Sequence, residues 1–179
     1  FELAVLNQRL RNPRAMYYHL ERILEIYPHN HESYMKMAEE MSKDGKWREV
    51  IPLLERSLSY TRGDEQKIAE TTGWLGTAHL RTREYDKATD LLLEVTRKYP
   101  DQIGATLRAY GNLVKYSRDS GKTKELDRYV EDVQRYARSL IRSGKDEEFP
   151  LLYQRMAQIM TIGGYPAEAQ EWAAQVQGQ

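Results

Sequence analysis

The sequence contains no cysteine among its 179 residues. This absence excludes disulfide bonds, a catalytic thiolate and a zinc ion held by thiolates. It does not identify the compartment, because proteins of reducing and of oxidising compartments can both lack cysteine.

The sequence also lacks a net charge and a long apolar run. Lysine plus arginine and aspartate plus glutamate each number 27, so the formal net charge at neutral pH is zero. Domains that bind nucleic acid through phosphate contacts are usually basic, so we expect no nucleic-acid partner. No stretch approaches the ~18 apolar residues of a membrane-spanning helix, so we expect no membrane span.

No signal-like segment follows Phe1, and the first residue is not methionine. We therefore expect the chain to be a fragment of a longer protein, in which any targeting segment lies elsewhere. The compartment stays open at this stage. The absence of signal and membrane segments from the fragment slightly favours the cytoplasm.

Catalytic motifs are missing as well. The sequence has no GxSxG, P-loop, GxGxxG or HExxH pattern. Carboxylates such as Glu39 and Glu40 are adjacent, and neighbouring residues on a helix point in different directions. His29 and His31 have no third ligand nearby for a metal ion. The sequence therefore predicts no catalytic residue, no metal site, no cofactor and no enzymatic activity.

What the sequence does contain is a repeat. The stretches GKWREVIPLLERSL (45–58) and REYDKATDLLLEVT (83–96) place matching residues at matching positions. Small or apolar residues at spacings of three to four indicate one face of a helix. Five such sets recur along the chain: Met16, Leu20 and Ile23; Val50, Leu54 and Ser57; Ala88, Leu92 and Val95; Leu126, Val130 and Val133; and Ala169, Ala173 and Val176.

A second helical face precedes four of these sets, beginning at Tyr34, Thr72, Tyr110 and Tyr153. Between the two faces lie Gly45, Gly121 and Gly164, with Arg83 as the exception. Glycine is favoured where a helix ends in a left-handed residue and the chain reverses. Each unit therefore reads as helix, turn, helix, and stacked units bury what one pair cannot.

This pattern resembles the tetratricopeptide repeat (TPR) family. The resemblance is most specific in Tyr34, Met37, Ala38, Gly45, Trp47 and Leu54, and in Leu75, Gly76, Tyr85, Ala88, Leu92 and Pro100. It implies an all-α fold, a right-handed α-solenoid of antiparallel helix pairs. We expect a single array of about five pairs over residues 1–179, divided as 1–30, 31–64, 65–102, 103–145 and 146–179.

In TPR-like arrays the first helix of each pair lines an inner, concave groove that binds a peptide or a helix of another protein. The resemblance carries this role to positions beside the core residues. The predicted partner-binding residues are Met35, Glu39, Trp74, Thr77, Arg108, Asn112, Lys115, Arg155 and Gln158. The early positions include the acid Glu39, and the later ones include the bases Arg108, Lys115 and Arg155. An anionic group is therefore expected to dock near Arg108, Asn112, Lys115 and Arg155.

Trp74 has two interpretations. It could anchor a ligand beside Gly73, or it could pack against the next unit while Gly73 makes room. The sequence does not decide between them.

The predicted function is a protein–protein interaction scaffold. The alternatives are a self-assembling structural module, whose uncapped ends associate with a second copy, and a regulatory domain of a larger enzyme or transcription regulator. The expected partners are thus another protein or peptide, or a second copy of the chain.

Overall fold

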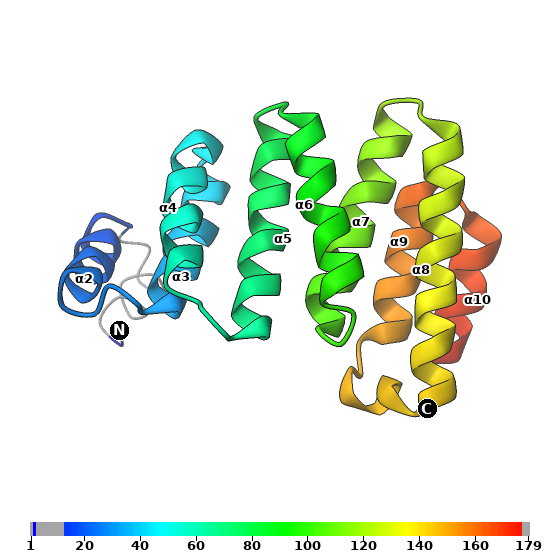
Figure 1. Ribbon diagram of the computed structural model, residues 1–179. Coiled ribbons are helices and arrows are strands. Elements are labelled where there is room, and N and C mark those ends of the chain that lie inside the picture. The colour runs from blue at the N-terminus through cyan, green and yellow to red at the C-terminus, as the bar shows by residue number, and fades with distance from the viewer. Residues whose placement is uncertain (1, 3–12, 177–179) are drawn as a thin grey trace. The chain divides into compact units, whose positions relative to one another are not determined.

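The structure is a computed structural model that describes residue 2 and residues 13–176. Over this part of the chain the fold is all-α, as predicted, with no strand (Figure 1). The helices are α2 (Pro13–Ile26), α3 (His31–Lys43), α4 (Trp47–Ser59), α5 (Glu65–Arg81), α6 (Tyr85–Lys98), α7 (Ile103–Asp119), α8 (Thr123–Ser143), the 3₁₀ helix η1 (Lys145–Glu148), α9 (Leu152–Gly163) and α10 (Pro166–Val176). None of the described helices is long and apolar enough to cross a membrane.

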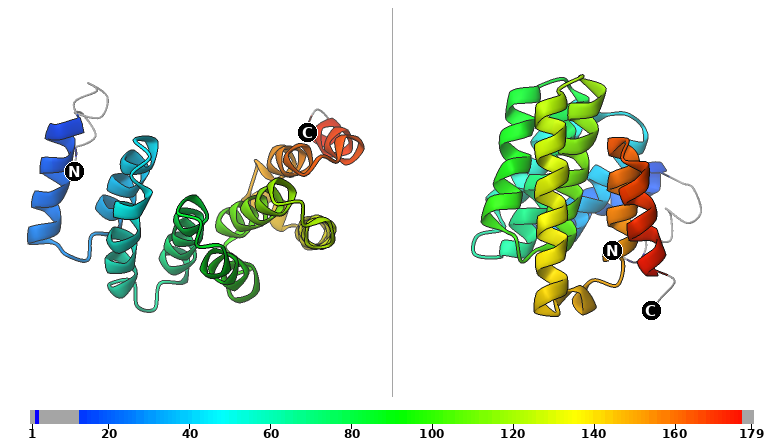
Figure 2. Two further views of the ribbon diagram at one scale, coloured as in Figure 1. Left: turned by 90° about the horizontal axis from the view of Figure 1, so that it is seen from above. Right: turned by 90° about the vertical axis from the view of Figure 1, so that its right-hand side faces the viewer.

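The chain divides within α6 into two compact units, one ending at Ala88 and the other beginning at Thr89. In the first unit, α3 packs on α2 and α4, and α4 packs on α5. In the second, α7 packs on α8 and α9, and α9 lies beside α10 (Figure 2). The division into five helix pairs stays a prediction, because most of the first predicted helix lies outside the described residues.

Four turns between helices share one hydrogen-bond pattern. In each, an N–H beyond the turn donates to a carbonyl five residues earlier: Lys46 to Met41 (2.9 Å), Glu84 to His79 (2.9 Å), Lys122 to Ser117 (2.8 Å) and Tyr165 to Met160 (2.9 Å). This is the Schellman closure of a helix, which needs one left-handed residue. Gly45, Gly121 and Gly164 supply it with φ of +73°, +66° and +89°, and Arg83 supplies it with φ of +67°. The predicted turns, including the exception, are confirmed.

Side chains fix several helix starts. The side chain of Asn30 accepts a hydrogen bond from the Ser33 N–H at 2.9 Å, and Asp64 accepts one from the Lys67 N–H at 3.0 Å. These caps satisfy N–H groups that a first helical turn leaves without a partner. Pro13 and Pro166 begin α2 and α10, where the missing N–H of proline costs little.

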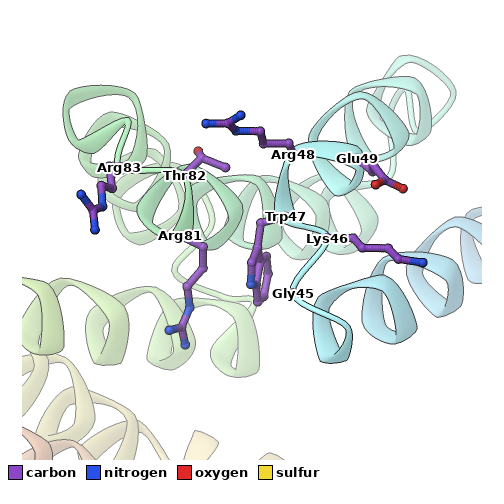
Figure 3. Close-up of a pocket in the computed structure, with 8 residues that line it drawn as sticks. All are labelled: Gly45, Lys46, Trp47, Arg48, Glu49, Arg81, Thr82 and Arg83. Carbon is purple, nitrogen blue, oxygen red and sulfur yellow. The ribbon is translucent and has the colours of Figure 1, made fainter.

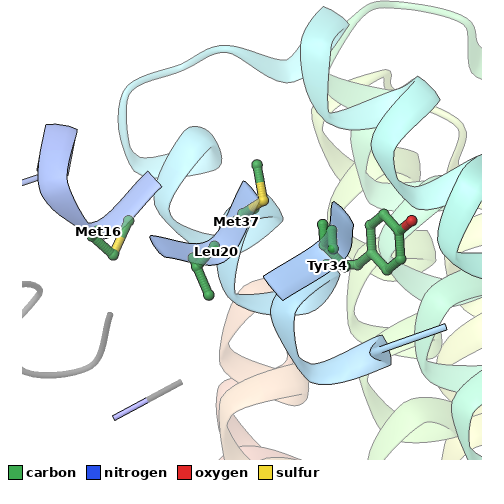
Figure 4. Close-up of a cluster of buried hydrophobic side chains, with 5 residues drawn as sticks. Met16, Leu20, Tyr34 and Met37 are labelled. Atoms are coloured by element: carbon green, nitrogen blue, oxygen red, sulfur yellow. The ribbon is translucent and has the colours of Figure 1, made fainter. Parts of the chain in front are cut away.

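The core of the first unit joins the two predicted helical faces. Met16, Leu20 and Leu24 of α2 form a buried cluster with Tyr34 and Met37 of α3 (Figure 4). The Tyr34 hydroxyl donates to the carbonyl of Pro28 at 3.0 Å, which satisfies the polar end of an otherwise buried ring.

In the second unit most predicted core positions of α7, α8 and α9 are buried, but Tyr110 and Leu126 are only half-buried. The prediction fails for most of α10, where Ala169 is half-buried. Leu113, Val130 and Met156 are buried. Ala173 and Val176, predicted as core, are exposed, and the neighbouring Trp172 is buried instead. The Trp172 ring packs on Tyr153 of α9 with the ring centroids 6.0 Å apart. Trp172, which the spacing rule did not select, is therefore the buried residue of α10.

Candidate protein-interaction site

Glycines on α7 allow a close approach of the segment that leads into α9 and of α9 itself. A Cβ atom added at Gly111 would lie 3.5 Å from Ile159 Cγ1, and one at Gly104 would lie 3.5 Å from Phe149 Cε2. At the far end of α9, a Cβ atom at Gly163 would lie 3.2 Å from Val114 Cγ1. At Gly104 and Gly111 an added Cβ atom would thus be at an ordinary van der Waals distance, whereas at Gly163 it would be crowded.

A cavity of about 370 Å³ opens along this contact. Its floor is apolar and comes from both helices and the loop before α9: Gly104, Leu107, Gly111, Phe149, Leu151, Ile159 and Ile162. Leu107 and Ile159 are buried, whereas 38% of the Ile162 surface is exposed. An apolar floor with an accessible edge can take up an apolar side chain of a ligand.

Five of the nine predicted partner-binding residues line this cavity: Arg108, Asn112, Lys115, Arg155 and Gln158. Their positions follow from helical spacing, since residues three and four apart share one face of α7 or of α9. Arg108, Lys115, Arg155 and Gln158 are exposed, and Asn112 is half-buried. Three cations thus surround the apolar floor, and no residue lining the described cavity is acidic.

The rim side chains already make weak local contacts. Lys115 Nζ lies 2.8 Å from Asp119 Oδ2 one turn further along α7, and both side chains are more than half exposed. Arg155 Nη1 donates to Gln158 Oε1 at 3.3 Å. Exposed ion pairs of this kind contribute less than about 1 kcal/mol, so a ligand can replace them.

Arg118 lies on the same helix as Arg108 but serves the fold. Its Nη1 donates to the carbonyl of Ile162 at 2.7 Å and to that of Thr161 at 3.4 Å. These carbonyls belong to the last turn of α9, where hydrogen-bond donors and positive charge are favourable. Arg118 therefore ties α7 to the end of α9.

The other four predicted residues lie in the first unit, and none of them lines the cavity described above. Glu39 forms ion pairs with Lys36 at 3.0 Å and Lys43 at 3.1 Å. Burial opposes ionisation of Glu39, but the hydrogen bonds from the two lysines win and hold its pKa below the ordinary value. Thr77 donates to the Gly73 carbonyl at 2.9 Å, within its own helix.

Met35 and Trp74 are half-buried in this unit. Met35 Sδ lies 3.9 Å from the Thr71 hydroxyl of α5, so it contributes to the contact between α3 and α5. At Gly73 an added Cβ would meet nothing within 4 Å, so the glycine leaves open space beside Trp74. The role of all nine residues in binding stays a prediction.

His31 joins the same contact. Its Nε2 lies 2.9 Å from Thr71 Oγ1. Burial lowers the pKa of His31 below its ordinary value of 6.5, and the nearby Glu70 only partly offsets this effect. Among the described residues, no three histidine, aspartate or glutamate side chains come together in a way that could hold a metal ion.

The sequence did not predict the floor residues Phe149, Ile159 and Ile162. Helical spacing identified the polar rim because α7 and α9 each present one face. It could not show that the loop before α9 turns Phe149 toward Gly104 of α7. The only available signal was the pair Gly104 and Gly111, two turns apart on one helix.

Solved structures share this fold. A crystal structure of MamA superposes with a TM-score of 0.59 at 17% identity, over 99% of this chain and 94% of that chain. A crystal structure of nearly identical TPR-like repeats from Podosopora anserina, described as those of a kinesin light chain, gives a TM-score of 0.63 at 17% identity, over 99% and 91%. No family model matches the sequence, and no curated protein matches it. The likeness establishes the fold, a TPR-like repeat solenoid, as the resemblance predicted.

Proposed function

We propose that the chain is a protein-interaction module and that the cavity between α7 and α9 binds a peptide segment or helix of a partner. One observation carries the proposal. Five side chains predicted to bind a partner line a single cavity with an apolar floor. Buried apolar anchors inside a polar rim are the usual anatomy of a protein interface.

The partner segment is acidic and carries one apolar side chain. Arg108, Lys115 and Arg155 supply three positive charges around the cavity, and Lys115 exchanges its exposed pairing with Asp119 for the ligand. Such charges act mainly on the association rate and on orientation. The apolar side chain of the ligand enters the floor beside Ile162 and supplies most of the binding free energy.

No catalytic role is proposed. Among the residues that line the cavity, Lys115 is the one with a side chain that could act as a base or a nucleophile, and it is exposed and paired with Asp119 at 2.8 Å. A binding role accounts for both the apolar floor and the cationic rim of the cavity.

The proposal is tested with a peptide selected from a random library on the immobilised protein. We expect an acidic peptide with one apolar residue. Arg155→Glu should weaken its binding by about tenfold, mostly through slower association at low salt. Ile162→Ser should weaken it mainly through faster dissociation, with little change in melting temperature because this side chain is partly exposed.

Arg135→Glu is the matched control, because Arg135 lies on α8, does not line the cavity, and has an exposed side chain that pairs with Asp132 at 3.3 Å. Equal loss of affinity in this variant and in Arg155→Glu would reject the proposed site. Light scattering over a concentration series covers the self-assembling alternative. If the chain dimerises and the peptide competes with dimerisation, the occupant of the cavity is a second copy.

A further inference from the structure

A second cavity, of about 580 Å³, lies within the first unit where two of the Schellman turns come together. Residues 45–49 at the start of α4 form one side, and residues 81–83 at the end of α5 form the other (Figure 3). Four of the eight lining residues are cations, Lys46, Arg48, Arg81 and Arg83, and Glu49 is the one acid among them. The predicted partner face uses none of these residues.

Two of the arginines have no anionic partner. Within residues 13–176, Arg48 and Arg83 form no ion pair or hydrogen bond through their side chains, and both are exposed. Glu84, next to Arg83, is engaged by Lys87 at 2.9 Å and by the Thr82 hydroxyl at 3.1 Å. The guanidinium groups therefore retain their capacity to bind an anion.

Arg81 is held in place without being neutralised. Its guanidinium lies 5.6 Å from the centre of the Trp47 ring, and the two side chains point to the same side of the cavity (Figure 3). Stacking on an aromatic ring orients a guanidinium and leaves its hydrogen-bond donors available. Arg48 extends from α4 toward Thr82, so the arginines approach the cavity from both of its sides (Figure 3).

The backbone at Arg83 is an independent observation. Three equivalent turns have glycine at the left-handed position, and Arg83 alone among the described non-glycine residues has a positive φ. A residue with a Cβ atom is strained in this conformation, and such strain is characteristic of functional positions. The strained position places a guanidinium at the edge of a cavity that already holds two others.

We propose that this cavity binds a phosphorylated side chain, phosphothreonine or phosphoserine, of a partner protein. A phosphoryl group carries a charge of roughly −1.5 to −2 and three acceptor oxygens. Arginine forks match this geometry and charge better than they match a single carboxylate. Nucleic acid is the weaker candidate, because the chain has zero net charge and Trp47, which could stack on a base, is covered by Arg81.

The test uses two peptide libraries that differ at one fixed position, phosphothreonine in one and threonine in the other. The wild-type protein should retain the phosphorylated library about tenfold better, the effect of one or two charge-assisted hydrogen bonds. Arg83→Gly and Arg48→Gln should each remove most of this preference. Arg62→Ala, an exposed arginine in the loop between α4 and α5 that does not line the cavity, should keep it.

Arg83→Gly separates binding from folding, because glycine relieves the strained turn. This variant should melt at a higher temperature than the wild type and still lose the preference. Equal retention of the two libraries by the wild type would overturn the proposal. An unchanged preference for phosphothreonine in Arg83→Gly would also overturn it, whether or not inorganic phosphate competes with the peptides for both proteins. Retention of single-stranded RNA without a preference for phosphothreonine would also overturn it and assign the cavity to nucleic acid.

Discussion

At the residue scale, a methyl group added at Gly73 would have no close neighbour, whereas one added at Gly163 would be crowded. At Gly73 it would contact nothing within 4 Å, whereas at Gly163 it would lie 3.0 Å from Tyr165 Cδ2 and 3.2 Å from Val114 Cγ1. Glycine inside a helix costs about 0.5–1 kcal/mol relative to alanine, so Gly73→Ala should stabilise the first unit by about that amount. Gly163→Ala should destabilise the second unit by roughly 1–3 kcal/mol through overpacking. Urea unfolding measures both, and changes of the same sign would contradict these contacts.

His31 makes the first unit sensitive to pH. Burial lowers its pKa in the folded protein below the unfolded value of 6.5, so the unfolded chain takes up the proton first as the pH falls. The contribution of neutral His31 to the free energy of unfolding is therefore fully present above pH 6.5. It is lost as the pH falls from 6.5 to the lower pKa of His31 in the folded protein.

We expect His31→Gln to remove this component of the pH dependence. Melting curves between about pH 8 and about pH 5.5, for wild type and variant, measure it. The charged groups near residue 31 are the same in both proteins: Glu32, Asp64, Lys67 and Glu70. The difference in melting temperature between the two proteins therefore reports the titration of His31. If the difference in melting temperature does not vary with pH, the pKa of His31 is the same in the folded and unfolded chains, which contradicts the prediction.

At the scale of elements, the four turns predict how single substitutions change stability. Gly121 has a φ of +66°, so Gly121→Ala should cost about 1–2 kcal/mol for a Cβ atom in the left-handed region. Arg83→Gly should act in the opposite direction, by roughly 1 kcal/mol. Thermal unfolding of the two variants provides the measurement. An unchanged melting temperature in Gly121→Ala would contradict the left-handed conformation of residue 121 in this turn.

The helices and turns could be predicted from sequence because their determinants are local. Glycine at a left-handed position and apolar residues at helical spacing act within a few residues of chain. The rim of the α7–α9 cavity was predictable for the same reason. Its floor was not, since Phe149 reaches Gly104 from a distant part of the chain, and Trp172 replaced the predicted core positions of α10 through its contact with Tyr153.

At the scale of the whole molecule, the chain divides within α6 into two compact units. Units coupled mainly to their neighbours unfold in steps, so the calorimetric enthalpy of unfolding should exceed the van't Hoff enthalpy. Gly163→Ala should then lower the transition of the second unit and leave that of the first in place. A single transition with equal enthalpies, shifted as a whole by Gly163→Ala, would show that the two units unfold together.

The measurement that tests the central claim most directly is a residue-by-residue map of where a selected peptide binds. Backbone amide resonances of the protein are recorded as the peptide is added. The largest shifts should fall on α7, on α9 and on the loop around Phe149. Arg155→Glu should require about tenfold more peptide to produce them, whereas Arg135→Glu should not change the peptide concentration required. Shifts centred on α8 and α10, with the resonances of Arg108, Asn112 and Gln158 unmoved, would contradict the claim that this cavity is the interaction site.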